Sequence, residues 1–225
     1  MRRKPFSGAQ AILWTALAGL LLAGPLPLRA QIPGLMNSTL SIPGGVQTFS
    51  IAVGPDGNIW LTDFTGNKIG RLTPAGVYTA FSVPTANAGP RFITNGPDGN
   101  LWFTEFNLRQ IGRITPAGVI AEFAVPGSSI PTTLDAIVAG PDGNIWFADG
   151  AFTQNTQVGR IAPDGTGVTE FPIGGSMVNG QIAAGPDGNV WFSDHGESTV
   201  NRIGKITTDG VVTVYMLPSP GIPLP

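Results

Sequence analysis

The sequence predicts an all-β fold, a β-propeller built from four-stranded antiparallel blades. Three observations lead to this prediction. The pentapeptide Gly-Pro-Asp-Gly-Asn occurs four times, beginning at Gly54, Gly96, Gly140 and Gly185. Each copy is followed by an apolar residue and then a tryptophan, and the copies are 42, 44 and 45 residues apart. After the first 30 residues no stretch has the 3.6-residue apolar period of an amphipathic helix. Repeats of this length with several short strands are typical of propeller blades.

Within each repeat, the residue pattern indicates four strands joined by turns. In the first unit we expect strands at about Phe49–Val53, Ile59–Asp63, Ile69–Thr73 and Val77–Val83. The Pro-Asp-Gly-Asn corner suits a tight turn, because proline presets φ and glycine accepts positive φ. The tryptophan should fill the space between neighbouring sheets, where its burial is worth roughly 2–3 kcal/mol.

The repeats divide the chain into predicted segments. We expect a signal peptide at 1–30, a lead-in with a partial strand at 31–45, propeller repeats at 46–218 and a proline-rich tail at 219–225. The blades should cover about 46–84, 88–126, 132–173 and 178–218. Four full units and a partial one leave the closure open. The chain could form an open or incomplete ring, which we favour, a compact four-bladed ring, or half of a larger ring made by two chains.

The N-terminus has the layout of a secretory signal peptide. Arg2, Arg3 and Lys4 precede the apolar run Ala11–Gly24, and the small residue Ala30 stands at the expected cleavage site. An uncleaved membrane anchor is the alternative, although the run is short for a membrane span. We therefore expect a secreted or periplasmic protein with no stable membrane association after cleavage.

Composition limits the possible functions. The net charge is −2 and only 12% of the residues are charged, so no basic surface for nucleic acid is expected. The chain contains no cysteine, which excludes disulfides, thiolate nucleophiles and cysteine metal sites.

Residues that recur in every unit are most simply explained as scaffold. An acid lies three residues after each tryptophan, and a basic residue follows each later Ile-Gly or Val-Gly pair. We expect the acids to bind backbone amides or these basic residues. The acids are Asp63, Glu105, Asp149 and Asp194; the basic residues are Arg71, Arg113, Arg160 and Lys205.

The string GPDGN-x-W-[LF]-x-[DE], followed by [IV]-G-[RK], a turn and an aromatic strand, resembles the streptogramin B (virginiamycin B) lyase family over nearly all of Gln47–Leu217. The resemblance implies a propeller, usually of seven blades. It also implies a magnesium-assisted elimination that opens the ester-closed ring of a cyclic peptide antibiotic. The family pattern uses histidines eleven residues before a tryptophan and a metal-binding glutamate four residues after it. Here the first position holds Phe49, Arg91, Asp135 and Gly180, and the second holds Phe64, Phe106, Gly150 and His195.

Residues that break the repeat on one face are the candidates for function, because loops on one side of a propeller commonly bind ligands. His195, the single histidine of the chain, is the candidate catalytic residue, as a base or metal ligand. Its neighbours Asp194 and Glu197 are candidate metal ligands. The candidate substrate-binding residues are Arg91, Asp135, Asn155, Gln181 and Arg202.

Two functions remain open from the sequence. The first is an exported propeller that binds a small molecule, cyclic peptide or protein partner, or a degenerate relative of the lyases. The second is an active magnesium-dependent lyase. Open blade edges would also allow the chain to form a homo-oligomer.

Overall fold

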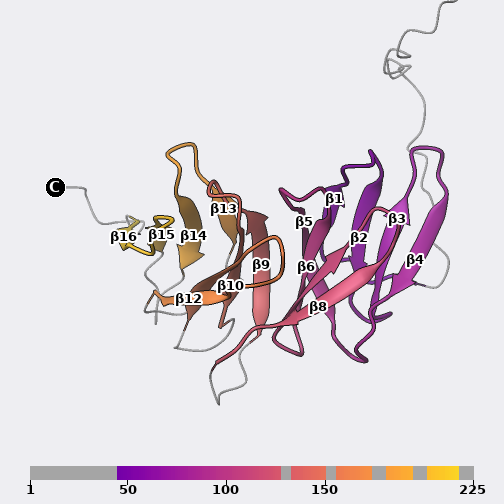
Figure 1. Ribbon diagram of the computed structural model, residues 1–225, viewed down its shortest axis with the longest axis horizontal. Helices are drawn as coiled ribbons and strands as arrows, with labels where there is room; N and C mark the ends of the chain where they lie inside the picture. Colours follow the sequence, from indigo (N-terminus) through magenta and orange to yellow (C-terminus); the bar gives the residue numbers. More distant parts are fainter. Residues whose placement is uncertain (1–44, 128–132, 151–155, 174–180, 195–201, 218–225) are drawn as a thin grey trace, which may run out of the picture. The chain divides into compact units, whose positions relative to one another are not determined.

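The computed structural model describes residues 45–127, 133–150, 156–173, 181–194 and 202–217. These residues form four antiparallel sheets of four strands each, with no helix among them (Figure 1). The first sheet holds β1 (Ile51–Val53), β2 (Ile59–Asp63), β3 (Lys68–Leu72) and β4 (Tyr78–Ser82). The second holds β5 (Pro90–Asn95), β6 (Leu101–Glu105), β7 (Gln110–Ile114) and β8 (Ile120–Ala124).

The other two sheets repeat the same order of neighbouring strands. The third consists of β9 (Leu134–Ala139), β10 (Ile145–Asp149), β11 (Gln157–Ile161) and β12 (Thr169–Pro172). The fourth consists of β13 (Ile182–Ala184), β14 (Val190–Asp194), β15 (Arg202–Ile206) and β16 (Val212–Met216). Each sheet is thus a meander, and the predicted all-β propeller blade is confirmed. The signal peptide predicted at 1–30 and the tail predicted at 219–225 lie outside the described residues.

The Gly-Pro-Asp-Gly-Asn corner is a hydrogen-bonded turn that also fixes the tryptophan. Asp56 Oδ1 accepts the backbone N–H of Asn58 at 3.1 Å and the indole N–H of Trp60 at 3.0 Å. Although burial opposes ionisation, hydrogen bonds from Trp60 and Asn58 hold the pKa of Asp56 below its ordinary value. Gly57 has φ +73°, which explains the second glycine of the corner. The other three copies repeat the aspartate-to-indole bond.

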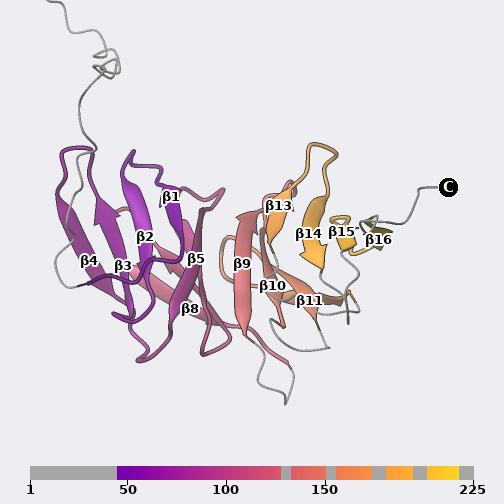
Figure 2. The same cartoon turned by 180° about the vertical axis from the view of Figure 1, so that it is seen from behind.

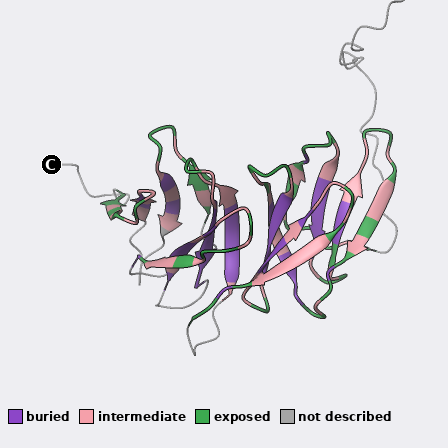
Figure 3. Ribbon diagram, in the orientation of Figure 1, coloured by how far each residue is buried: buried purple, intermediate pink, exposed green. Residues whose placement is uncertain are grey.

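The core lies between consecutive sheets. Trp60, Trp102 and Trp146 are fully buried, and each packs against the sheet that follows its own. Figure 3 shows buried residues concentrated in the inner strands, and every residue of β6 and β10 is buried. The predicted role of the tryptophans as spacers between sheets is confirmed for these three.

The repeated basic residues link neighbouring sheets. Arg71 lies over the rings of Trp60 and Phe81, and its Nη1 donates to the backbone carbonyl of Pro116 at 2.8 Å, in the next sheet. Arg113 and Arg160 form the same bridges to Pro163 and Thr208. The basic residues therefore join sheets. Of the two partners expected for the acids, basic residues or backbone amides, Asp63 has the backbone amides of Gln47 and Gly66.

Contacts between sheets connect each sheet with the one that follows it in the chain. β5 contacts β1, β2 and β9, and β13 contacts β9 and β10. Figure 2 allows this succession to be followed from the opposite side. No helix in the described part of the chain is long and apolar enough to cross a membrane.

Candidate functional site

Arg91 and Asp135, two predicted substrate-binding residues, form an ion pair between the second and third sheets. Arg91 is the second residue of β5, and Asp135 is the second residue of β9. Arg91 Nη1 lies 3.2 Å from Asp135 Oδ1, and the two side chains are 13% and 1% exposed. Because β5 contacts β9 directly, residues at the beginning of these two strands meet across the sheet boundary.

The Arg91 guanidinium lies over three phenylalanine rings, those of Phe49, Phe92 and Phe106. The Arg91 guanidinium carbon lies 4.4 Å from the ring centre of Phe106 and 5.4 Å from that of Phe49. The Phe64 ring contacts both, edge to face, with centres 5.2 Å from Phe49 and 6.0 Å from Phe106. We call these five residues, Phe49, Phe64, Arg91, Phe106 and Asp135, the Arg91 cluster. Phe49 is 45% exposed, so the cluster offers an apolar ring to solvent.

The cluster assembles the two sequence positions that the family pattern marks. Phe49, Arg91 and Asp135 stand eleven residues before a tryptophan, at the beginning of the first strand of a sheet. Phe64 and Phe106 stand four residues after one, just past the end of the second strand. Residues at equal positions of successive units thus meet in the structure. The sequence did not predict that phenylalanines would complete the site, because single phenylalanines at these positions resemble ordinary core residues.

Burial controls the electrostatics of the ion pair. Burial raises the pKa of Asp135, and the positive charge of Arg91 acts in the opposite direction. The cluster therefore supplies a fixed cation, a single carboxylate and an aromatic surface. Among the described residues, no group of three or more acidic, histidine or cysteine side chains is placed to hold a metal ion.

The remaining predicted site residues do not all lie in this cluster. Gln181 is exposed, precedes β13, and its backbone N–H donates to Ser193 Oγ at 2.9 Å. Arg202 begins β15, so both belong to the fourth sheet. Asp194 ends β14, but its side chain is not described. His195, Asn155 and Glu197 lie outside the described residues, and their roles stay predictions.

A second buried acidic site was missed by the sequence reasoning. Glu105, at the end of β6, is fully buried, and the carboxyl group of Glu122 from β8 lies within hydrogen-bonding reach. Burial, together with the negative charge of Glu122, raises the pKa of Glu105 to about 8. Glu122 accepts the backbone N–H and the hydroxyl of Thr85 at 3.0 and 2.9 Å. Glu105 can thus carry a proton at neutral pH.

The third sheet has the same two acidic positions but neutralises them differently. Asp149 takes the place of Glu105, and Glu170 takes the place of Glu122, since both face a glycine of the neighbouring strand. The guanidinium group of Arg109, from the turn before β7, bridges Asp149 and Glu170; its Nη2 lies 2.6 Å from Glu170 Oε1. The sequence analysis treated the four acids as equivalent. The residues of the second strand, at whose end each acid stands, do not reveal whether an arginine or a proton neutralises the acid.

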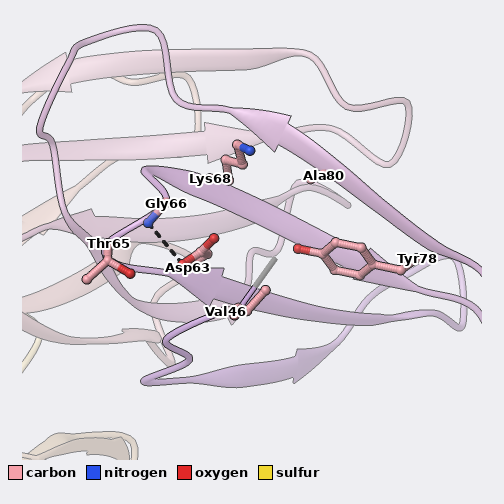
Figure 4. A pocket seen from close by; sticks show the side chains of 8 residues that line it. Val46, Asp63, Thr65, Gly66, Lys68, Tyr78 and Ala80 are labelled. Carbon is pink, nitrogen blue, oxygen red and sulfur yellow. Dashed lines mark hydrogen bonds between the residues drawn. The ribbon is translucent and has the colours of Figure 1, made fainter. Parts of the chain in front are cut away.

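The first sheet has a cavity at the corresponding place, because Ala80 occupies the position of Glu122. The cavity has a volume of about 380 Å³ (Figure 4). Asp63 lines it and accepts the backbone N–H of Gly66 at 3.0 Å and of Gln47 at 3.3 Å, as expected for a scaffold acid. Tyr78 lies opposite, and burial, with a contribution from the charge of Asp63, raises its pKa. The lining residues are Gly45, Val46, Asp63, Thr65, Gly66, Lys68, Tyr78 and Ala80.

Comparisons with known proteins agree with this geometry. Residues 36–223 match the model of the virginiamycin B lyase family. A curated virginiamycin B lyase from Bordetella bronchiseptica is 44% identical over 46 residues, which cover 20% of this chain and 15% of that protein.

Solved structures of the same kind match over most of the chain. Virginiamycin B lyase from Staphylococcus aureus is 35% identical, with a TM-score of 0.68, over 80% of this chain and 59% of that enzyme. A catalytically inactive variant of the S. aureus enzyme with quinupristin is 34% identical, with a TM-score of 0.69, over 78% of this chain and 57% of its own. A gluconolactonase from Xanthomonas campestris, 14% identical with a TM-score of 0.55 over 78% of this chain and 77% of its own, shares the fold alone. The chain thus spans less than two thirds of the lyase structures it matches.

Proposed function

Since the chain belongs to the virginiamycin B lyase family, we propose that it is an exported, ligand-binding member of that family whose site is the Arg91 cluster. One observation carries the proposal. The two positions at which the family pattern has its histidines and metal-binding glutamate meet in space, and in the described sheets they hold phenylalanine, arginine, aspartate and glycine. The location of a family site is retained while its residues favour binding.

The residues of the cluster suit a ligand with an aromatic or apolar ring and a carbonyl or carboxylate group. Phe49 is the exposed ring, and Phe64 holds it by an edge contact. Arg91 is oriented by Asp135, and a guanidinium fixed by a buried carboxylate can donate to a ligand oxygen without losing further conformational freedom. Cyclic depsipeptides with aromatic side chains present both kinds of group.

The same residues give less support to catalysis. Arginine cannot accept a proton at any accessible pH, so Arg91 cannot act as a general base. Asp135 is held by Arg91 and is 1% exposed, which keeps its carboxylate away from solvent. The alternative, an active magnesium-dependent lyase, depends on His195 with Asp194 and Glu197, whose side chains are not described.

Binding of quinupristin, measured by isothermal titration calorimetry, tests the proposal. Phe49→Ala should weaken binding by about tenfold or more, because an exposed ring at the centre of a site is a typical hot spot. Val119→Ala is the matched control, since Val119 is an exposed apolar residue of the second sheet's last turn, outside the cluster. Equal affinities for the wild type and Phe49→Ala, or no binding by either, would contradict the proposal.

The same samples distinguish binding from catalysis. Quinupristin is incubated with the protein, with and without magnesium, and followed by its chromatographic retention, because ring opening by elimination leaves the mass unchanged. We expect no conversion. Magnesium-dependent conversion that His195→Ala abolishes would instead establish the lyase alternative.

Export is a separate part of this proposal, and it rests on the basic and apolar N-terminal pattern. Expression in a bacterial host, followed by N-terminal sequencing of the extracytoplasmic protein, should give a chain that begins at Gln31. Recovery of the uncleaved chain in the membrane fraction would favour the anchor alternative.

A further inference from the structure

The boundary between consecutive sheets is built in the same way three times in this chain. We call the face that a sheet turns toward the next sheet of the chain its outgoing face, and the face turned toward the preceding sheet its incoming face. The outgoing face carries a tryptophan, an aromatic residue stacked on it and a basic residue above both rings. The incoming face of the next sheet supplies apolar residues of its second and third strands, a turn carbonyl for the basic residue, and a turn glycine against the aromatic ring. Because the two faces differ, an outgoing face is complementary to an incoming face and not to another outgoing face.

The fourth sheet has a complete outgoing face. In the first three sheets the following sheet covers this face, but no described residue covers it in the fourth. Trp191 stacks on Tyr215, with ring centres 5.7 Å apart, and Lys205 Nζ lies 5.5 Å above Trp191. Trp191 is half-buried, whereas the other three blade tryptophans are fully buried. Ile203 is also half-buried, while Ile69, Ile111 and Val158 at the same position are 0% exposed.

This face is apolar and hollowed. A shallow cavity of about 180 Å³ is lined by Gln181, Ile182, Ala183, Trp191, Phe192, Ser193 and Ile203. Tyr215, which corresponds to half-buried phenylalanines of the other sheets, is 42% exposed. Lys205 pairs with Asp187 at 3.6 Å, as Arg160 pairs with Asp142, but no described carbonyl receives it as Thr208 receives Arg160. The described fourth sheet therefore has every component of an outgoing face.

The first sheet has the complementary incoming face. Leu72 is half-buried, whereas Ile114, Ile161 and Ile206 at the same position are fully buried. Pro74 occupies the turn position whose carbonyl, in Pro116 and Pro163, accepts an arginine from the preceding sheet. In the described part of the chain, the fourth sheet thus has a partly exposed outgoing face and the first sheet a partly exposed incoming face, on which Leu61 is already buried.

We propose that the outgoing face of the fourth sheet binds the incoming face of the first sheet of a second copy of this chain. In this joint Lys205 of one copy donates to the Pro74 carbonyl of the other, and Tyr215 packs against the turn at Gly76. The commitment to a second copy rests on continuity: the joint repeats an interface that the chain already forms three times, with matching donor and acceptor. Unlike faces give a heterologous interface, which either closes into a ring or extends.

Mixing two singly blocked variants of the full chain tests this direction. Tyr215→Glu blocks the outgoing face and leaves the incoming face intact, and Leu72→Glu does the reverse. Light scattering coupled to size-exclusion chromatography should find the wild type associated and each variant alone monomeric, with self-affinity lowered roughly tenfold or more. An equimolar mixture of the two variants should give a dimer, because one intact joint remains. Val119→Glu is the control and should associate like the wild type.

Each other outcome counts against the proposal. A monomeric wild type would mean that residues of the same chain outside the described ranges cover these faces, or that the faces do not bind. Association that both variants retain would place the contact elsewhere, for example in the apolar N-terminal run. A mixture that stays monomeric would exclude the head-to-tail joint.

Cross-linking provides a readout that does not depend on the blocking variants folding well. The chain has no cysteine, so single cysteines can be introduced cleanly. Ala75→Cys in one sample and Tyr215→Cys in the other should be joined by a short bis-maleimide only after mixing. Val119→Cys mixed with Tyr215→Cys should give no product, and equal yields from both mixtures would overturn the joint.

Discussion

Replacing Glu105 with glutamine should abolish a pH-dependent loss of stability. Glu105 is 0% exposed and faces Glu122, and burial with this like charge raises its pKa to about 8, against 4.5 for the ordinary carboxyl group. Between these two pH values the folded protein holds a proton that the unfolded chain has released. The free energy of unfolding therefore falls as pH rises through this window and becomes constant above about pH 8.

The size of the effect follows from the width of the window. Each unit of pKa difference corresponds to about 1.4 kcal/mol, so the interval of about 3.5 units gives an upper value of about 5 kcal/mol. Glutamine has nearly the same shape as the protonated acid and is uncharged at every pH in this range, so it removes the titration. Glu105→Gln should match the wild type near pH 5 and exceed its stability by about 3–5 kcal/mol near pH 9.

Urea denaturation followed by tryptophan fluorescence at unit steps from pH 5 to pH 9 measures this difference. Asp149→Asn is the matched control, because the same strand position in the third sheet is neutralised by Arg109 instead of a proton. Removing that charge should destabilise the fold by about 1.5–3 kcal/mol throughout the range, because Arg109 loses one of its two carboxylate partners and keeps Glu170. Parallel pH profiles for the wild type and Glu105→Gln would refute the assignment of the slope to Glu105.

Two further pairs of substitutions test the packing between sheets. Trp102→Ala should cost about 3–5 kcal/mol in the free energy of unfolding, and Trp191→Ala distinctly less, because only Trp102 is fully buried; equal losses in thermal unfolding would contradict this assignment. Gly165→Ala should destabilise by about 2 kcal/mol more than Gly143→Ala in the same assay. Both glycines have positive φ, at 88° and 77°, but a Cβ at Gly165 would stand 2.0 Å from the Phe123 ring and one at Gly143 would meet nothing within 4 Å.

The sequence predicts the blade well because its signals are local. In the first sheet β2 has the predicted bounds, Ile59–Asp63, and β3 is displaced by one residue from the predicted Ile69–Thr73. Strand β1 begins two residues later than expected, at Ile51. Before it the ladder is irregular: Ser50 N–H donates to Thr62 Oγ1 at 3.2 Å, while the Ser50 carbonyl still accepts the Thr62 N–H at 3.1 Å. Turn chemistry and apolar alternation determine the meander without reference to other sheets.

The site was predictable only in part because it is assembled across sheet boundaries. The ion pair of Arg91 with Asp135 joins residues 44 positions apart, and nothing in either local sequence requires the other. Their shared position before a tryptophan was the usable signal, since equal positions in successive blades approach the same region. The phenylalanines after the acids lacked such a signal. Their role depends on Arg91, and the other three units have a different residue at its position.

The two acidic sites illustrate how a repeated scaffold acquires different chemistry at equal positions. Asn67 and Arg109 both precede the third strand of their sheets and have nearly the same φ, 53° and 52°. Arg109 extends to the acids of the next sheet, whereas Asn67 is too short and binds the Thr85 carbonyl at 2.9 Å instead. A buried acidic pair must be neutralised by a cation or by a proton. Because Asn67 provides no cation, Glu105 is neutralised by a proton, and its pKa rises to about 8.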